Sequence, residues 1–273
     1  MARKPTQQIV LTVDQLTIRF GGLTAVDSMT FDVHEGEVLS LIGPNGAGKT
    51  TAFNAITGYL KPSSGNIAYQ GTSLVGLKPN QIAELGVVRT FQKTSVFGGE
   101  TAFHNVLMGL HRQLKQKPWQ IIFGLPSVAA EERAMRNKAR EVLEFVGLGA
   151  RANELGNALP YGEQRLLEVA IALAARPSLL LLDEPVSGMN PSETSSFMKL
   201  LGEIRKLGIT VLLVEHDMKM VMGVSDRVVV LNYGSIIANG SPAEIQKNPD
   251  VIRAYLGERH RKTQAKSKGK KRA

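Results

Sequence analysis

The pattern of apolar and polar positions changes along the chain from strand-like to helical and back again. Strand-like stretches cover Val10–Phe20 and Ala25–Val33, and a continuous apolar run predicts a buried strand over Val38–Ile42. A glycine-rich turn follows this run, and the next stretch, from about Lys49 to Thr57, fits a helix. The order of strand, loop and helix is typical of an α/β core.

Further strands are predicted over Gly65–Tyr69 and Val87–Phe91. From about Thr101 to Ala175 the pattern is mostly helical, and it includes the charged, periodic stretch Glu131–Val146. Strand and helix then alternate in the order Leu179–Asp183, Glu193–Leu207, Thr210–Val214, Met218–Val224 and Arg227–Asn232. We therefore expect a mixed sheet with a parallel core, an antiparallel β part at the N-terminal side and a helical subdomain inserted at about residues 100–175.

The composition of the chain excludes cysteine chemistry, and its hydropathy gives no sign of a membrane-spanning helix. The 273 residues are 43% apolar, which is enough for a sizeable core, and they include no cysteine. Structural disulfides, Cys-zinc sites and thiol catalysis are therefore excluded. The polar stretch Met1–Gln8 has no apolar signal segment, and no apolar run approaches the roughly 18 residues of a membrane-spanning helix. We expect any link to a membrane to go through another polypeptide or through surface charge.

The net charge of +9 is concentrated at the C-terminal end. Residues 259–273 contain eight Lys and Arg and no acid, so residues 1–258 carry only +1. We expect residues 1–258 to form the folded domain and residues 259–273 a disordered, solvated tail. Attraction of the tail to anionic lipid headgroups is a functional alternative. Nucleic-acid binding is a weaker third interpretation, because no aromatic residue is interleaved with the charges.

A short apolar cluster between two prolines, Pro118–Pro126, contains the only tryptophan of the chain. Packing of a short loop into the core is one interpretation of this cluster. A partly exposed docking surface is the alternative, and the sequence does not decide between them.

The turn after the third strand has the pattern G-x-x-x-x-G-K-S/T. Its residues are Gly43, Pro44, Asn45, Gly46, Ala47, Gly48, Lys49 and Thr50. Glycines let backbone N–H groups turn towards phosphate oxygens, and the helix that follows adds its positive N-terminal end. Lys49 would reach the β- and γ-phosphates, Thr50 would ligate Mg²⁺, and Thr51 would donate to the α-phosphate.

Two carboxylates, Asp183 and Glu184, end the apolar run Leu179–Leu182. Nucleotides bind at the carboxyl ends of strands in α/β sheets, so we expect Asp183 to meet Mg²⁺ and Glu184 to polarise the attacking water as general base. A solvated acidic turn is the alternative. His216 follows another apolar strand and would contact the γ-phosphate, and Gln92 would contact Mg²⁺ or the water, but each is a weak signal alone.

Taken in order, these residues resemble the nucleotide-binding subunits of ABC transporters, and the match runs to about Glu258. The resemblance gives Gln92 the place of the Q-loop glutamine and His216 that of the switch histidine. It gives Phe20 the place of the aromatic residue that stacks on adenine. The family's signature motif corresponds to Leu159–Arg165, in which Tyr161, Gly162 and Glu163 would meet nucleotide, and its D-loop corresponds to Ser187–Asn190.

Within this family the chain looks like the larger nucleotide-binding subunit of branched-chain amino-acid transporters, with urea-type uptake subunits as close relatives. The signature departs from the usual LSGGQ, because Pro160 replaces a serine that would contact the γ-phosphate and supplies no N–H. Losing one neutral hydrogen bond typically costs about 1 kcal/mol, which weakens such a site without abolishing it. Asn190, where many members have Asp, is a second departure.

The resemblance implies ATP hydrolysis with Mg²⁺ by a peripheral subunit at the cytoplasmic face of the cell (inner) membrane. It implies a second nucleotide-binding subunit, with a paralogue in a heterodimer favoured over a homodimer, two transmembrane permease subunits and an extracytoplasmic solute-binding protein. Uptake of branched-chain amino acids or related small solutes is the expected function, without nucleic acid as a partner. The alternatives are a soluble ABC ATPase with an assembly or nucleic-acid role, and a regulatory module without turnover, which only Pro160 suggests.

Overall fold

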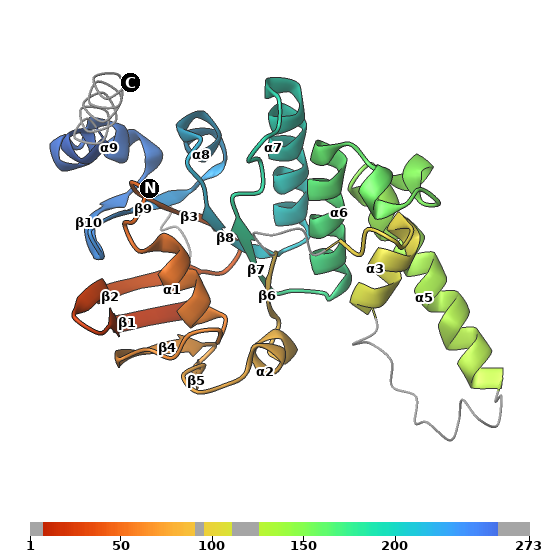
Figure 1. The fold of residues 1–273 in the computed structure, drawn as a ribbon, viewed down its shortest axis with the longest axis horizontal. Helices are drawn as coiled ribbons and strands as arrows, with labels where there is room; N and C mark the ends of the chain where they lie inside the picture. Colours follow the sequence, from red (N-terminus) through yellow and green to blue (C-terminus); the bar gives the residue numbers. More distant parts are fainter. Residues whose placement is uncertain (1–7, 91–95, 111–125, 256–273) are drawn as a thin grey trace, which may run out of the picture. The chain divides into compact units, whose positions relative to one another are not determined.

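The computed structural model describes residues 8–90, 96–110 and 126–255, with side chains from residue 130 onwards in the last range. The chain divides into two compact units. The first unit is formed by the chain up to Leu85 and from Arg205 onwards, and the second unit is formed by Gly86–Ile204. Figure 1 shows the elements of both units along the chain.

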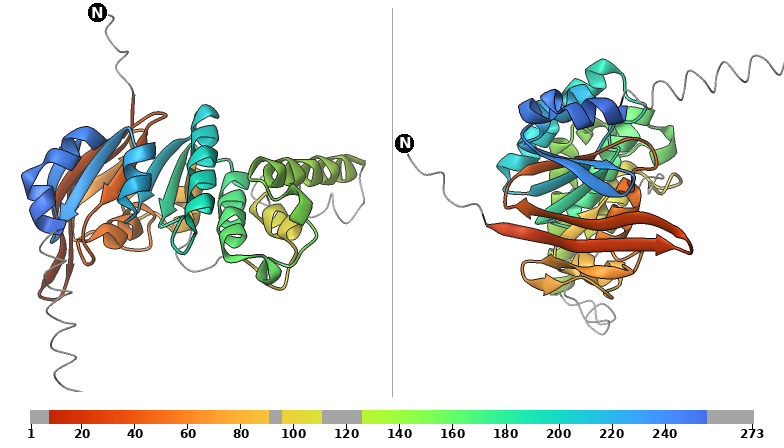
Figure 2. Two further views of the ribbon diagram at one scale, coloured as in Figure 1. Left: turned by 90° about the horizontal axis from the view of Figure 1, so that it is seen from above. Right: turned by 90° about the vertical axis from the view of Figure 1, so that its left-hand side faces the viewer.

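An antiparallel sheet occupies the N-terminal part of the first unit. It consists of β1 (Ile9–Phe20), β2 (Leu23–His34), β4 (Ser64–Tyr69) and β5 (Thr72–Ser73), in the order β2-β1-β4-β5. The long hairpin of β1 and β2 is drawn in red in the right-hand view of Figure 2, with β4 in orange. This sheet confirms the predicted antiparallel β part at the N-terminal side.

Parallel strands carry the glycine-rich turn. β3 (Val38–Ile42) lies between β8 (Thr210–Val214) and β9 (Arg227–Asn232) and is parallel to both, while β10 (Ser235–Gly240) pairs with β9 antiparallel. Every residue of β3 and β8 is buried, as expected for strands covered on both faces. The helices of this unit are α1 (Lys49–Ile56), α2 (Pro79–Glu84), α8 (Met218–Val224) and α9 (Pro242–Lys247).

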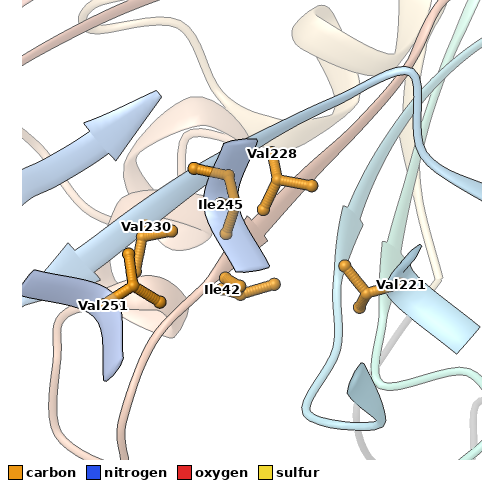
Figure 3. Close-up of a cluster of buried hydrophobic side chains, with 6 residues drawn as sticks. All are labelled: Ile42, Val221, Val228, Val230, Ile245 and Val251. Carbon is orange, nitrogen blue, oxygen red and sulfur yellow. The ribbon is translucent and has the colours of Figure 1, made fainter. Parts of the chain in front are cut away.

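A buried apolar cluster supports the strand that leads into the glycine-rich turn (Figure 3). Ile42, the last residue of β3, packs with side chains from β9, α8, α9 and the segment beyond α9. The other members are Val221, Val228, Val230, Ile245 and Val251. Since Ile42 is fully buried and directly precedes Gly43, this packing fixes where the turn begins.

The second unit combines a strand pair with helices. β6 (Val87–Arg89) and β7 (Leu179–Asp183) are parallel, with Val87 opposite Leu179. The helices are α3 (Ala102–Leu110), α5 (Pro126–Phe145), α6 (Tyr161–Ala174) and α7 (Pro191–Lys206), and two short 3₁₀ turns cover Gly149–Arg151 and Gly156–Ala158. Helices α3, α5 and α6 pack on one another, as Figures 1 and 2 show.

The predicted elements agree closely with the observed ones where apolar runs are strong. The bounds of β3, β7, β8, β9 and α8 are those predicted, whereas α5 begins earlier, at Pro126, and β6 ends at Arg89 instead of residue 91. The sequence interpretation missed β5, α2, β10 and α9. Gln92, most of the Pro118–Pro126 cluster and the basic tail lie outside the described residues. None of the described helices is both long and apolar enough to cross a lipid bilayer.

Candidate functional site

The glycine-rich turn between β3 and α1 has a backbone that only glycine adopts readily. Gly43, Gly46 and Gly48 have φ angles of 153°, 80° and 102°. A Cβ at Gly43 would lie 2.2 Å from the carbonyl oxygen of Leu231, and one at Gly48 would lie 2.5 Å from that of Ala25. The turn is thus held tightly against β9 and β2, while a Cβ at Gly46 would meet no atom within 4 Å.

Lys49 folds back over this turn. Its Nζ donates to the carbonyl oxygens of Gly43, at 2.6 Å, and Pro44, at 3.0 Å, and the side chain is buried. The first hydrogen bond of α1 runs from Ala52 N to Gly48 O, so the N–H groups of the preceding helical residues have no acceptor within the helix. Positive charge and backbone donors therefore converge on one turn, which is the chemistry of an anion cradle.

A second turn of the first unit supports the cradle from behind. Gly234, between β9 and β10, donates its N–H to Ala47 O at 3.0 Å and accepts from Asp27 N at 2.9 Å. Phe20 lies at the end of β1, where it pairs with Leu23, and it is 50% exposed. An aromatic ring with half of its surface in water is available for stacking on a flat ligand.

The strand ends of β3 and β8 bring His216 to the edge of the sheet that bears the cradle. Leu41 pairs with Val214 in parallel register, so Gly43 and His216 each lie two residues beyond a matched pair. The buried carboxylate of Glu215 accepts from the backbone N–H of His216 at 2.8 Å, while the His216 side chain is 60% exposed. The loop backbone is thus fixed by Glu215, a residue that sequence reasoning missed, and the imidazole faces solvent.

In the second unit, Asp183 ends β7 with a fully buried side chain. Its Oδ2 accepts from Nη2 of Arg89, the last residue of β6, at 2.7 Å. Its Oδ1 is also buried and has no hydrogen-bond partner among the described residues. A buried carboxylate oxygen without a donor is costly unless a cation or a further donor reaches it.

Glu184 follows with a backbone conformation that non-glycine residues rarely adopt. Its φ is 49°, in the left-handed region, and its carbonyl oxygen accepts from Ser187 N at 3.1 Å. This conformation costs a side-chain-bearing residue roughly 1–2 kcal/mol. Five other non-glycine residues of the described chain also have a positive φ, so this turn fixes the backbone of Glu184 without by itself assigning it a role.

The predicted signature segment forms the start of α6 and contacts the predicted D-loop. Pro160 is the N-cap of α6, and Tyr161 and Gly162 open the helix. The Tyr161 ring covers Gly188, where a Cβ would lie 2.7 Å from Cε1 of the ring. A Cβ at Gly162 would lie 2.9 Å from Oε1 of Glu193, whose carboxylate accepts from Asn190 N at 2.8 Å. The signature segment and the D-loop therefore pack directly against each other.

Ion pairs and hydrogen bonds of charged side chains stabilise the start of α6. Arg165 donates to the Tyr161 hydroxyl at 2.7 Å and to Glu168 at 2.9 Å. Burial alone would lower the pKa of Arg165, but the hydrogen bonds to Glu168 and Tyr161 outweigh it and raise the pKa above its ordinary value. Glu163, in the first turn of α6, pairs with Nε of Arg151 at 3.3 Å.

Each of the two units offers an oxygen donor that suits a metal ion. No group of three His, Asp or Glu residues that could hold an ion occurs in the part of the chain that the structure describes. Asp183 Oδ1 and the exposed hydroxyl-bearing residue Thr50 are hard oxygen donors of the kind that Mg²⁺ takes from proteins, with the remaining ligands coming from phosphate and water. The first unit contains the cradle, Phe20 and His216, and the second unit contains Asp183, Glu184 and the signature segment.

Comparison with known proteins shows the family of this chain. Residues 26–187 match the family described as ABC transporter, and residues 235–261 match the one described as branched-chain amino acid ATP-binding cassette transporter. The chain is 47% identical over 252 residues to the high-affinity branched-chain amino acid transport ATP-binding protein LivG of Salmonella typhimurium, covering 92% of this chain and 99% of the relative. It is 46% identical to BraF of Pseudomonas aeruginosa, covering 91% and 98%.

A solved structure with the same fold is the ADP conformation of an ATP-binding cassette of an ABC transporter. It is 30% identical, with a TM-score of 0.80, and the alignment covers 92% of this chain and 99% of that one. The fold predicted from the sequence, a P-loop ATPase core of mixed sheet and helices, is thereby confirmed. The glycine turn, the acidic strand end and these matches together establish that this chain belongs to the ATP-binding cassette family of ABC transporters.

Proposed function

We propose that this chain is the ATP-hydrolysing subunit of an importer for branched-chain amino acids or related small solutes. The observation that carries the proposal is the cradle of three positive-φ glycines with Lys49 buried over it. Nearly full-length similarity to LivG and BraF supports the choice of solute, because both are described as branched-chain amino acid transport proteins.

In this proposal the first unit binds the triphosphate of ATP. The first-turn N–H groups of α1 donate to phosphate oxygens, and Lys49 Nζ exchanges its two carbonyl acceptors for the β- and γ-phosphates. Phe20 stacks on adenine from the end of β1. His216 approaches the γ-phosphate from the end of β8.

The acidic strand end would supply the groups for hydrolysis. Thr50 and Asp183 Oδ1 would hold Mg²⁺, which neutralises charge that develops on the phosphates. Glu184, fixed by its strained backbone, accepts a proton from the attacking water as general base. Gln92, outside the described residues, is proposed as a further contact to the metal or the water.

The signature segment is proposed to act on the ATP of a second nucleotide-binding subunit, with Tyr161, Gly162 and Glu163 at the N-terminal end of α6 facing its phosphates. A heterodimer with a paralogous subunit is favoured, and the pair works with two transmembrane permease subunits and an extracytoplasmic solute-binding protein. The proposed location of the subunit is the cytoplasmic face of the cell membrane. Closure around ATP and reopening after hydrolysis would drive the membrane subunits, because the triphosphate binds the closed state more tightly.

Uptake by cells tests this function. In a strain that lacks the gene for this chain, uptake of radiolabelled leucine should fall, and the wild-type gene should restore it. The Glu184→Gln variant, expressed at the same level, should not restore uptake. Unchanged leucine uptake in the deletion strain would refute branched-chain amino acids as solutes, and full rescue by Glu184→Gln would refute Glu184 as the base.

A further inference from the structure

Arg89 forms a buried ion pair with Asp183 in the second unit, and it has no role in the function proposed above. Arg89 Nη2 lies 2.7 Å from Asp183 Oδ2, and the two side chains are 8% and 0% exposed. Arginine is almost never buried to this extent without a paired acid, so the contact is a defining feature of the site. Its position is set by the parallel ladder, in which Arg89 lies opposite Leu181, two residues before Asp183.

The two oxygens of the Asp183 carboxylate differ in their surroundings. Oδ2 is occupied by the guanidinium of Arg89, whereas Oδ1 has no hydrogen-bond partner within the described residues. The backbone around it is also fixed, since Thr90 Oγ1 accepts from Asp183 N at 3.4 Å and Thr90 N donates to Leu181 O at 2.9 Å. One oxygen of the carboxylate is therefore paired with the Arg89 guanidinium, and the other can bind a metal ion.

We propose that Arg89 is a positioning residue that neutralises the charge of Asp183 while no metal is bound. Its guanidinium and Mg²⁺ would then lie beside the same carboxylate and repel each other. This inference rests on the proposed role of Asp183 as a partner of the metal. An isolated buried carboxylate would be unfavourable, and Arg89 makes the metal-free state stable. The same positive charge weakens the binding of a doubly charged ion beside it.

Two effects of Arg89 on the metal have opposite signs, and their sizes decide the prediction. Arg89 orients the carboxylate, which helps the metal, but this fixes only one short side chain whose backbone is already held by Thr90. Arg89 also repels Mg²⁺ as a full charge against a double charge at a few Å in a poorly screened place, which is an effect several times larger. Removing the charge should therefore strengthen metal binding.

The test compares the affinity of the full-length protein for a fluorescent ATP analogue in excess Mg²⁺ with its affinity in EDTA. The ratio of the two affinities reports the coupling between metal and nucleotide and does not depend on turnover. In Arg89→Met, which keeps an unbranched stem as far as the position of Nε but has no charged group, the ratio should rise about tenfold over wild type. Arg89→Lys keeps the charge and should stay near the wild-type ratio. An unchanged or lower ratio in Arg89→Met would overturn the proposal.

Asp183→Asn separates this inference from the proposed function. It should reduce the ratio towards one, and a ratio that stays at the wild-type value in Asp183→Asn would show that the proposed metal role of Asp183 itself is wrong. Unfolding by urea in EDTA gives a second measurement. Arg89→Met should unfold at lower urea than wild type, and Arg89→Met/Asp183→Asn should recover because no charge is left unpaired. If Arg89→Met does not fold, a folded double variant supports the proposal, and a double variant that also fails to fold contradicts it.

Discussion

Gly46→Ala is the sharpest test of the phosphate cradle, because the chain contains a matched control. Gly46 and Gly71 both have a φ of 80°, both are exposed, and a Cβ at either would meet no atom within 4 Å. Gly46 lies in the turn before α1, whereas Gly71 lies in the turn between β4 and β5. The two alanine variants therefore carry the same backbone strain at two places with different expected functions.

The effect on stability should be equal in the two variants. An alanine in this left-handed conformation costs roughly 1–2 kcal/mol in the free energy of unfolding. The effect on ATP affinity should differ, because a methyl group on the open side of the turn would displace the phosphates from the backbone donors. One hydrogen bond to a charged group is worth about 1.5–3 kcal/mol, so Gly46→Ala should weaken ATP binding by roughly tenfold to more than a hundredfold, and Gly71→Ala should not.

Urea unfolding and calorimetric titration with ATP in Mg²⁺ measure the two quantities on the same protein samples. The reasoning is refuted if Gly46→Ala binds ATP as tightly as wild type while both variants lose the same stability. It is also refuted if the two variants lose ATP affinity equally, since the loss would then come from destabilisation and not from the cradle.

Three further substitutions follow from the site. Lys49→Ala removes the Nζ that lies 2.6 Å from Gly43 O, and ATP affinity in a titration should fall by tenfold or more because a charged hydrogen-bond donor is lost. Glu184→Gln should keep ATP affinity while steady-state phosphate release by the reconstituted complex falls by about 10²-fold or more, and unchanged release would remove Glu184 as the base. Gly188→Ala should displace the Tyr161 ring, since its Cβ would lie 2.7 Å from Cε1, and should slow turnover with ATP binding unchanged, whereas wild-type turnover would show that this packing has no role.

The sequence was sufficient where one strong local signal fixes a structure. β3 is an apolar run interrupted only by Ser40 and ends in a glycine turn, β7 is a run of leucines that ends in a pair of acids, and the bounds of both were predicted without error. Helix α9 was missed although Ser241 and Glu244 form a capping box, a pattern that can be recognised from the sequence. Helix α2 has only one buried residue, Ile82, so it lacks the periodicity on which such predictions depend.

Contacts that depend on strand register could not be predicted. Arg89 and Asp183 are 94 residues apart, and their pairing follows only from the parallel ladder of β6 and β7. The packing of Tyr161 on Gly188 likewise requires the relative position of α6 and the loop before α7. The two valines before Arg89 did carry a signal, because a charged residue at the end of an apolar strand requires a partner when it is not exposed.

The central claim is that one magnesium-bound ATP is held by Lys49 and by Asp183 together. The most direct measurement is the Kd for ATP, with Mg²⁺ and with EDTA, for wild type, Lys49→Ala and Asp183→Asn. We expect Lys49→Ala to weaken ATP binding under both conditions, and Asp183→Asn to weaken it only with Mg²⁺. Wild-type affinity for magnesium ATP in either variant would contradict the claim.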